Sequence, residues 1–467
     1  MLFEGIAATR RLRLTVLAAF GAGALAMYQP GQAQNAPVPS AGAPVATPAA
    51  PAAPAAPAAP MFPDAAATDP VTAGWMQGFP PAAAKVISFT PASNGFPRTR
   101  WSFSHIRELV PTAAVWHGRG PVSALPRAEH DIGGVPFTDA DGTRRTFNDM
   151  LGLTYTDGIL VMHKGRVVYE KYFGALDDHT PHIAMSVTKS FVGTLAAMLV
   201  ADGKLDPAAP VTRYLPEMAG TAYGDATVRE VMDMTVGVKY SENYADPKAE
   251  IWDYSRAGGM MPLEPGYAGP KTFYAFLATL KKEGEHDQAF AYKTVNAEVL
   301  AWIVKRVSGQ SLAKLLSERV WQKMGAENDA YFMVDSIGSE SGGGGLNTTL
   351  RDLARFGETM RNGGRFNGQQ IIPAEVVADI RRGGDRAKFA KAGYATLPGW
   401  SYRSMWWVSN DDHGVFEARG IHGQRIYVDP KAELTIVRYA SHPIAANGAN
   451  DPVTHRAYRA LALSLMK

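Results

Sequence analysis

Residues 182–200 constrain the chain most strongly, because they place a nucleophile and a base on one face of a predicted helix. Apolar residues such as Phe191 and Leu195 recur at helical spacing, which predicts a helix that faces the core. Ser186 then falls in the first turn, and Lys189 lies on the same face, close to the serine oxygen. A serine attacks poorly until a base removes its proton, and burial lowers the pKa of a lysine enough for it to be that base. The pattern predicts Ser186 as nucleophile and Lys189 as base.

A second Ser-x-x-Lys pattern, Ser311 to Lys314, shows that these four positions alone are weak evidence. Ser311 follows Gly309 and opens another amphipathic stretch, so we interpret it as a helix N-cap. For Ser186, the pattern by itself leaves a structural and a catalytic role equally open. The choice between them depends on residues elsewhere in the chain.

Two further segments complete the predicted site. Tyr292 stands just before a helical pattern and is expected to be an exposed phenol. A nearby ammonium group favours the ionised phenol, which can help to deprotonate a serine and later protonate a leaving amine, although a lone tyrosine is more often an ordinary aromatic. The glycine-broken segment 418–424 leads into a strand, and its backbone N–H groups are expected to form an oxyanion hole with that of Ser186. Ile421 and His422 are both candidates for the second donor, and a purely structural His422 is an equal alternative.

Two hairpins far apart in the chain predict one antiparallel sheet. Residues 155–174 contain two β-rich runs around a Lys164-Gly165 turn, and residues 425–440 repeat this pattern around Asp429-Pro430. Helical patterns lie at 228–234, 271–282, 296–307, 312–324, 350–362 and 454–466. Strands near both ends with helices between and after them predict an α+β fold over residues 74–467, in which terminal helices flank the antiparallel sheet and a mainly helical subdomain is inserted at about 205–345.

The N-terminal residues predict export. Arginines precede an apolar run at 14–27, and small residues follow at the cleavage positions, so residues 1–33 are interpreted as a secretory signal, with an uncleaved anchor as the alternative. The expected location is the bacterial periplasm or the medium, with no membrane span in the mature protein. Residues 34–73 are rich in alanine and proline, which is typical of a polyproline spacer or of a disordered leader without function.

Composition and missing motifs exclude several classes of function. The absence of cysteine excludes disulfides, thiolate metal sites and thiol-linked lipid anchors. A net charge of +3 over 467 residues gives no basic footprint for nucleic acid. The 11 histidines form no metal-binding motif, and there is no Gly-x-Ser-x-Gly elbow. The glycine run 342–345 is not followed by Gly-Lys-Ser/Thr, so we interpret it as a turn into a helix capped by Thr349 rather than as a phosphate loop. No metal or cofactor is expected.

Three motifs in order carry a resemblance to a known family. Ser186 to Lys189, Tyr292 to Thr294 and the strand segment 419–423 resemble the motifs of the class C β-lactamase and penicillin-binding-protein superfamily, in particular those of 6-aminohexanoate-dimer (nylon-oligomer) hydrolases and related carboxylesterases. The similarity extends from about residue 78 to the C-terminus and includes segments 100–103, 120–127, 233–237, 342–352 and 420–430. The resemblance implies a β-lactamase-like fold and a serine hydrolase that cleaves short linear amides or esters through an acyl-enzyme. A small-molecule substrate is implied, and a homodimer is compatible with the resemblance.

The chain departs from the β-lactamase pattern at two places. Thr294 stands where β-lactamases usually carry asparagine, and no Lys-Thr-Gly precedes the strand, so both departures count against penicillin recognition. A D-Ala-D-Ala carboxypeptidase or a β-lactamase is the alternative, since export and the Ser-x-x-Lys pattern fit it. A non-catalytic penicillin-binding-like module is a third hypothesis, but a binding protein needs none of Ser186, Lys189 and Tyr292.

Residues 239–254 combine aromatic and acidic side chains without sustained helical periodicity. This composition predicts a lid that excludes water from the site, with ordinary surface packing as the alternative. The resemblance implies that Tyr244 hydrogen-bonds the scissile nitrogen of the substrate. It also implies that Asp253 or a neighbour holds a substrate ammonium group.

Overall fold

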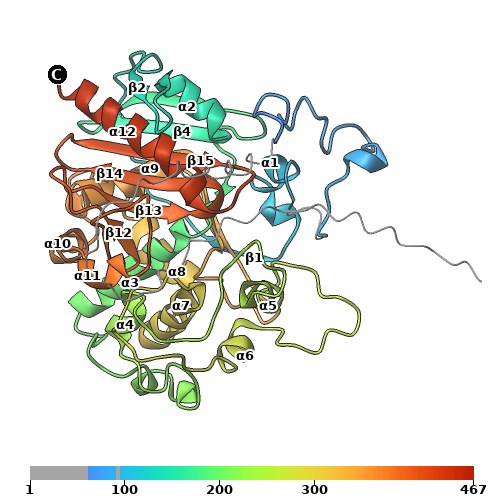
Figure 1. The fold of residues 1–467 in the computed structure, drawn as a ribbon, viewed down its shortest axis with the longest axis vertical. Helices are drawn as coiled ribbons and strands as arrows, with labels where there is room; N and C mark the ends of the chain where they lie inside the picture. The colour runs from blue at the N-terminus through green and yellow to red at the C-terminus, as the bar shows by residue number, and fades with distance from the viewer. Residues whose placement is uncertain (1–61, 91–94) are drawn as a thin grey trace, which may run out of the picture. The chain divides into compact units, whose positions relative to one another are not determined.

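The computed structural model describes residues 62–90 and 95–467, so the predicted signal at 1–33 and most of the predicted linker lie outside the described residues (Figure 1). The last linker residues contact the domain. The hydroxyl of Tyr155 donates to the carbonyl of Pro63 over 2.9 Å, and Thr68 is buried. Residues from Pro63 onward thus pack with the rest of the described chain, and the domain boundary at residue 74 stays a prediction. No helix in the described ranges is long and apolar enough to cross a membrane.

A seven-stranded antiparallel sheet in the order β11-β12-β13-β14-β15-β4-β5 is the centre of the fold. Its strands are β4 Thr156–His163, β5 Arg166–Tyr172, β11 Ser401–Arg403, β12 Trp406–Val408, β13 Phe416–Gly420, β14 Gln424–Asp429 and β15 Leu434–Ala440. Both predicted hairpins are confirmed, and β15 pairs with β4, so they share one sheet as expected. Lys164 and Gly165 have φ values of 50° and 77°, the left-handed conformations that a tight hairpin turn requires.

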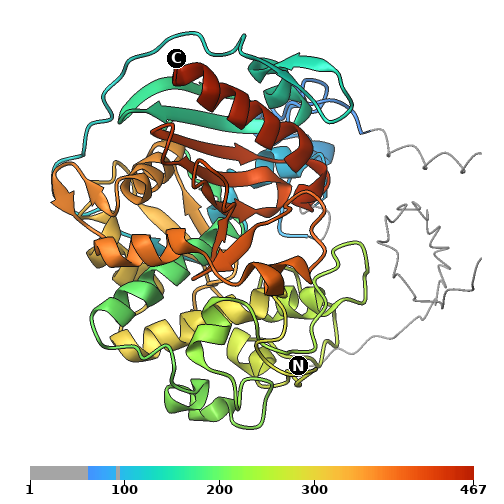
Figure 2. The ribbon, with the colours of Figure 1, turned by 60° about the vertical axis from the view of Figure 1, so that its left-hand side comes forward.

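Helices cover both faces of this sheet (Figures 1 and 2). Alternate residues of β4 point to opposite sides, so Leu160 belongs to the core shared with α9 Leu350–Arg361, whereas Ile159 packs with Tyr458 of α12 Asp451–Leu465. The helix α2 Phe147–Leu153 lies beside α12. The predicted α+β class and the terminal helix over the sheet are confirmed.

The residues between the two halves of the sheet form the helical layer. It contains α4 Val228–Met232, α5 Glu250–Ala257, α6 Phe273–Leu277, α7 Thr294–Ser308 and α8 Leu312–Leu316, which continues as a π-helix over Ser317–Trp321. The expected helix at 271–282 is shorter than predicted. The prediction that residues 250–254 belong to a lid without helical structure is wrong. Ile251 and Tyr254 pack into the core at helical spacing as part of α5.

A second sheet in the order β1-β7-β8-β6 supports the segment before Ser186. Its strands are β1 Thr112–Val115, β6 His182–Ile183, β7 Ala330–Met333 and β8 Leu346–Thr348. The helix predicted from residue 182 instead begins later, as α3 Val187–Ala201. Pairing of β6 with β8 keeps the chain extended, and Met185 follows with a left-handed φ of 48°, so a helix cannot form before Ser186.

The remaining α-helices and β-strands of the described chain are short. They are α1 Thr99–Ser102, β2 Pro136–Thr138, β3 Arg144–Thr146, β9 Arg365–Phe366, β10 Gln369–Gln370, α10 Ala374–Arg382 and α11 Arg386–Ala390. The helix α3 lies against β12, β13 and β14 on one side and against α7 on the other. The junction between the sheet and the helical layer therefore passes through α3.

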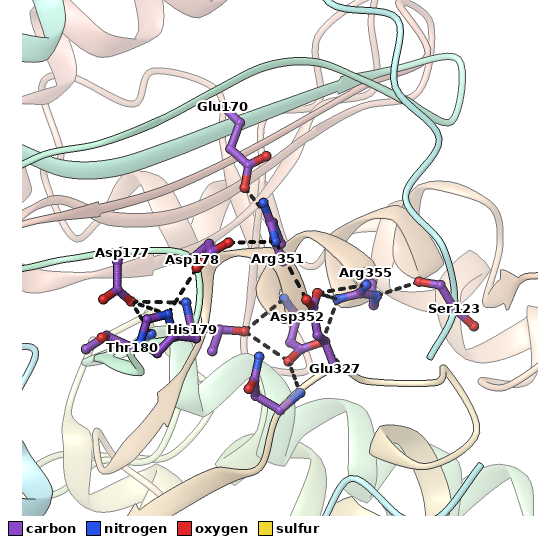
Figure 3. A network of polar contacts seen from close by, with 12 residues as sticks. Ser123, Glu170, Asp177, Asp178, His179, Thr180, Glu327, Arg351, Asp352 and Arg355 are labelled. Carbon is purple, nitrogen blue, oxygen red and sulfur yellow. Dashed lines mark hydrogen bonds and ion pairs between the residues drawn. The ribbon is translucent and has the colours of Figure 1, made fainter. Parts of the chain in front are cut away.

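An ion-pair network joins α9 to the neighbouring loops (Figure 3). Arg351 at the start of α9 binds Glu170 of β5 over 2.7 Å and Asp178 over 3.1 Å. The predicted cap is confirmed, because the Thr349 hydroxyl accepts from the backbone N–H of Asp352. The loop that leads into β6 is thereby tied to the sheet, which fixes the approach of the chain to Ser186.

Candidate active site

Ser186 and Lys189 meet at the start of α3. Ser186 is the N-cap residue, and its Oγ lies 2.8 Å from the Nζ of Lys189. Ser186 retains 8% exposure, whereas Lys189 is only 1% exposed. The predicted pairing on one helix face is confirmed, although Ser186 precedes the first turn instead of lying within it.

Burial makes Lys189 an unusual lysine. Its Nζ also donates to the carbonyl of Gly343 over 2.5 Å, and no carboxylate in the described ranges forms an ion pair with it. Desolvation lowers the pKa of Lys189 to about 8, against an opposing effect of the more distant Glu242 and Glu298 carboxylates. A large fraction of this amine is therefore neutral near pH 8 and able to accept a proton.

Tyr292 reaches the same point from the residues before α7. Its phenol lies close enough to the Ser186 hydroxyl for that group to lower its pKa, and its ring centroid lies 5.1 Å from Lys189 Nζ. The side chain is partly buried against Trp407, so the expectation of an exposed phenol is wrong. Burial and the Glu242 carboxylate raise the pKa of Tyr292 well above its usual value, which corrects the expected ionised phenol. The phenol is neutral and can donate or accept a proton only in concert with its neighbours.

The end of β13 closes the site beside Ser186. A Cβ on Gly420 would lie 2.7 Å from the carbonyl oxygen of Ala184, so only glycine allows this approach. His422 does not face the site with its N–H, because that group donates to the carbonyl of Ala445 over 2.9 Å. Its role as oxyanion donor is thus wrong.

The His422 ring has the structural role that the sequence left open, since its Nδ1 lies 2.7 Å from the carbonyl of His442. Of the two predicted candidates, Ile421 stays a prediction as the second oxyanion donor. The N–H of Ser186 makes no hydrogen bond to any residue in the described ranges, so it is available to donate to a substrate oxygen.

The predicted substrate residues lie in different surroundings. The hydroxyl of Tyr244 donates to Glu242 Oε1 over 2.8 Å, and Glu242 also accepts from the backbone and the hydroxyl of Thr294 over 2.7 and 2.8 Å. Tyr244 is therefore connected to the start of α7, near Tyr292. Asp253 lies on α5 with a half-exposed side chain bonded to Arg256, and its role in holding an ammonium group stays a prediction.

Glu242 and the Gly343 carbonyl are site residues that sequence reasoning missed. Glu242 lies in a stretch with several acidic residues, and the sequence does not show which of their carboxylates contacts Thr294. Gly343 was identified only as part of a turn. The other Ser-x-x-Lys pattern is an N-cap as predicted, because Ser311 Oγ accepts from the N–H of Lys314.

One group of side chains in the described part of the chain has the spacing of metal ligands, namely Asp177, Asp178 and His179. It lies at the surface, where Arg351 already pairs with Asp178 (Figure 3). Asp177 accepts from the backbone N–H of Thr180 over 2.7 Å, as in an ordinary turn. The group therefore needs no metal to explain its geometry.

Comparisons with known proteins agree with this geometry. The model of the β-lactamase family matches residues 144–460. A 6-aminohexanoate-dimer hydrolase from Paenarthrobacter ureafaciens is 34% identical over 383 residues, which cover 82% of this chain and 91% of the relative. A solved structure from Bacillus anthracis with the provisional name 6-aminohexanoate-dimer hydrolase has a TM-score of 0.76 at 29% identity, covering 83% of this chain and 98% of that one. An octameric penicillin-binding protein homologue from Pyrococcus abyssi shares the fold, with a TM-score of 0.51 at 19% identity over 68% of this chain and 76% of its own.

The lowered pKa of Lys189 predicts how the reactivity of Ser186 depends on pH. Labelling of Ser186 by a fluorophosphonate should accelerate as pH rises, with a midpoint near pH 8, because only the neutral amine can accept the serine proton. Labelling rates measured between pH 5 and pH 10 check this. The Lys189→Met variant should label slowly at every pH, and a wild-type midpoint near 6.5 would point to a histidine base instead.

Proposed function

Because the chain belongs to the β-lactamase family and is a serine hydrolase acting on amides or esters, we propose that it cleaves short linear amides of the 6-aminohexanoate-dimer type through an acyl-enzyme on Ser186. The observation that carries the proposal is the contact of Ser186 Oγ with the buried Lys189 amine and with the Tyr292 phenol. The 34% identity over most of both chains supports the substrate class.

Acylation follows from these contacts. Neutral Lys189 takes the proton from Ser186 Oγ as the oxygen bonds to the substrate carbonyl carbon. The carbonyl oxygen becomes an oxyanion, which the N–H groups of Ser186 and Ile421 stabilise by roughly 3 kcal/mol per donor. Tyr292 then passes its phenolic proton to the leaving nitrogen and regains a proton from the Lys189 ammonium. The C–N bond breaks, the amine departs and the acyl group stays on Ser186.

Deacylation uses the same groups in reverse order. Water enters where the amine left and gives its proton through Tyr292 to the neutral Lys189 amine. The resulting hydroxide attacks the ester carbonyl, and Ser186 leaves with the proton that Lys189 returns. Because Tyr292 is a neutral phenol beside Ser186, with Lys189 Nζ 5.1 Å from its ring centroid, it relays protons and does not itself need to ionise beforehand.

Two features favour this substrate class over a β-lactam. Thr294 does not point a free side chain at a ligand, because its hydroxyl donates to Glu242. On β13, the cation that precedes Gly420 is Arg419, which is ion-paired with Asp451 over 2.6 Å and acts on the Tyr292 phenol as a nearby positive charge. An arginine bound to α12 thus stands where the alternative hypotheses require the lysine of a Lys-Thr-Gly motif.

The proposal also covers the location of the protein. The residue pattern at 1–33 supports a secretory signal and a periplasmic or secreted enzyme. A homodimer is compatible with the family. Asp253, or a neighbouring residue, would hold the ammonium group of a cationic substrate.

Replacing the nucleophile tests the proposal. Ser186→Ala should reduce kcat/KM for p-nitrophenyl butyrate and for the 6-aminohexanoate dimer by roughly a thousandfold or more, because it removes the hydroxyl that Lys189 contacts. The matched control is Ser311→Ala, which removes only a helix cap and should keep full activity. An active Ser186→Ala variant would contradict the proposal, and a stable fluorescent-penicillin adduct on Ser186 would favour the penicillin-binding alternative.

Tyr244 should separate amide from ester hydrolysis. Its oxygen donates to Glu242 and still has lone pairs that can accept the N–H of a scissile amide. Tyr244→Phe should therefore lower kcat/KM for the 6-aminohexanoate dimer about tenfold or more, or ~1.4 kcal/mol, and spare p-nitrophenyl esters.

Tyr240→Phe is the matched control for this comparison, because the buried Tyr240 hydroxyl, on the same segment, has no hydrogen-bond partner in the described ranges. That variant should keep both activities. Equal losses on the amide and the esters in Tyr244→Phe would show that Tyr244 acts through folding or closure of the segment instead.

A further inference from the structure

Glu298 is a buried carboxylate that the reaction steps above do not use. It lies on α7 among apolar residues and is 3% exposed. Its Oε1 accepts from the hydroxyl of Tyr254 over 2.6 Å and from the N–H of Gly343 over 2.7 Å, and its Oε2 accepts from the N–H of Gly342 over 3.1 Å. The hydroxyl of Ser341 is a fourth partner at 3.1 Å. The α7 helix itself needs none of these four hydrogen bonds, so they indicate a role for the carboxylate outside the helix.

Gly343 connects Glu298 to the lysine. Its N–H is held by Glu298, while its carbonyl accepts from Lys189 Nζ over 2.5 Å. A Cβ at this position would lie 2.5 Å from Thr294 Cγ2 and 2.7 Å from the Tyr254 hydroxyl. The backbone therefore fits between α7 and α5 only as glycine, and its orientation is set from the side of Glu298.

This orientation matters for a lysine that works as a neutral base. A neutral amine has two N–H bonds and one lone pair. When the Gly343 carbonyl takes one N–H, rotation about the Cε–Nζ bond is limited and the lone pair can face Ser186 Oγ, 2.8 Å away. Without the carbonyl, nothing else in the described contacts of Lys189 would select that rotamer.

Charge adds a second effect. The groups that face Lys189 are Ser186, the neutral Tyr292 and the carboxylates of Glu242 and Glu298, which both stabilise its protonated form. Those that face Glu298 are Tyr254, Ser341, the two backbone N–H groups and, at longer range, Lys305. Burial raises the pKa of Glu298, but backbone N–H groups can only donate, so the arrangement of donors fits the ionised carboxylate.

We propose that Glu298 is a positioning residue that holds the Gly343 carbonyl on Lys189 and, through its negative charge, sets the pH at which Lys189 becomes a base. The inference rests on the proposed function of Ser186 and Lys189. It predicts two separable effects, one on the rate of acylation and one on its pH dependence. A residue that only maintained the fold would change stability without moving the pH profile.

Glu298→Gln tests both effects in the full-length protein with p-nitrophenyl butyrate. Loss of the negative charge destabilises protonated Lys189, so the acidic limb of the kcat/KM profile should shift to lower pH by about half a unit or more. The amide NH₂ of glutamine cannot accept a hydrogen bond from the backbone N–H groups that it faces. The Gly343 peptide is then held less well, so the plateau rate should fall about tenfold or more. Glu298→Asp keeps the charge but shortens the side chain, and should lower the rate with the midpoint unchanged.

The matched control is Glu340→Gln. Glu340 is equally buried and lies in the same segment, but it binds Lys305 and the N–H of Ala313 rather than the Gly343 peptide. Its variant should keep the wild-type midpoint. If Glu298→Gln does not fold, Gly343→Ala displaces the same carbonyl and should reduce kcat/KM about tenfold or more with little change in KM.

The outcomes separate the two levels of the account. A folded Glu298→Gln protein with an unchanged midpoint, or a fully active Gly343→Ala protein, would overturn the role of Glu298 while Ser186 still reacts in the wild type. A wild-type protein that hydrolyses no ester and takes up no fluorophosphonate at Ser186 would instead overturn the proposed function.

Discussion

The interaction on which the site depends is the burial of Lys189 beside Ser186 without a paired carboxylate. An ion pair at Nζ would keep the lysine protonated, whereas desolvation, only partly opposed by the more distant Glu242 and Glu298 carboxylates, brings its pKa to about 8. The protein replaces the missing counterion with neutral partners, which are the Ser186 hydroxyl, the Gly343 carbonyl and the face of the Tyr292 ring. Burying an amine without a counterion lowers the stability of the fold, and packing of the surrounding core must offset that loss.

The fold supplies that environment by bringing three distant segments to the start of α3. Pairing of β6 with β8 holds the chain extended over His182–Ile183, just before Ser186, and β8 follows the turn that carries Gly343. On the other side, Gly420 lets β13 approach the backbone of Ala184. The junction between the sheet and the helical layer therefore contains the nucleophile, its base and the predicted oxyanion donors.

Local patterns predicted much of this from the sequence. Period-two runs identified both hairpins, and the Ser-x-x-Lys spacing identified the 2.8 Å contact between Ser186 and Lys189. Long-range contacts were not predictable in the same way. The N–H of His422 donates to the carbonyl of Ala445, and the ring of Tyr292 is partly buried against Trp407, so both errors came from partners remote in sequence. Glu298 did leave a signal, namely one carboxylate in an otherwise apolar stretch of α7.

The central claim is that Ser186 carries the acyl group during turnover. The most direct measurement is acid quenching of the enzyme during hydrolysis of p-nitrophenyl acetate, followed by mass spectrometry of its peptides. The account predicts one acetyl group on the peptide that contains Ser186, at the serine itself, and none on the peptide that contains Ser311. Continued hydrolysis with no acetyl group on Ser186, or with the acetyl group on another residue, would contradict it.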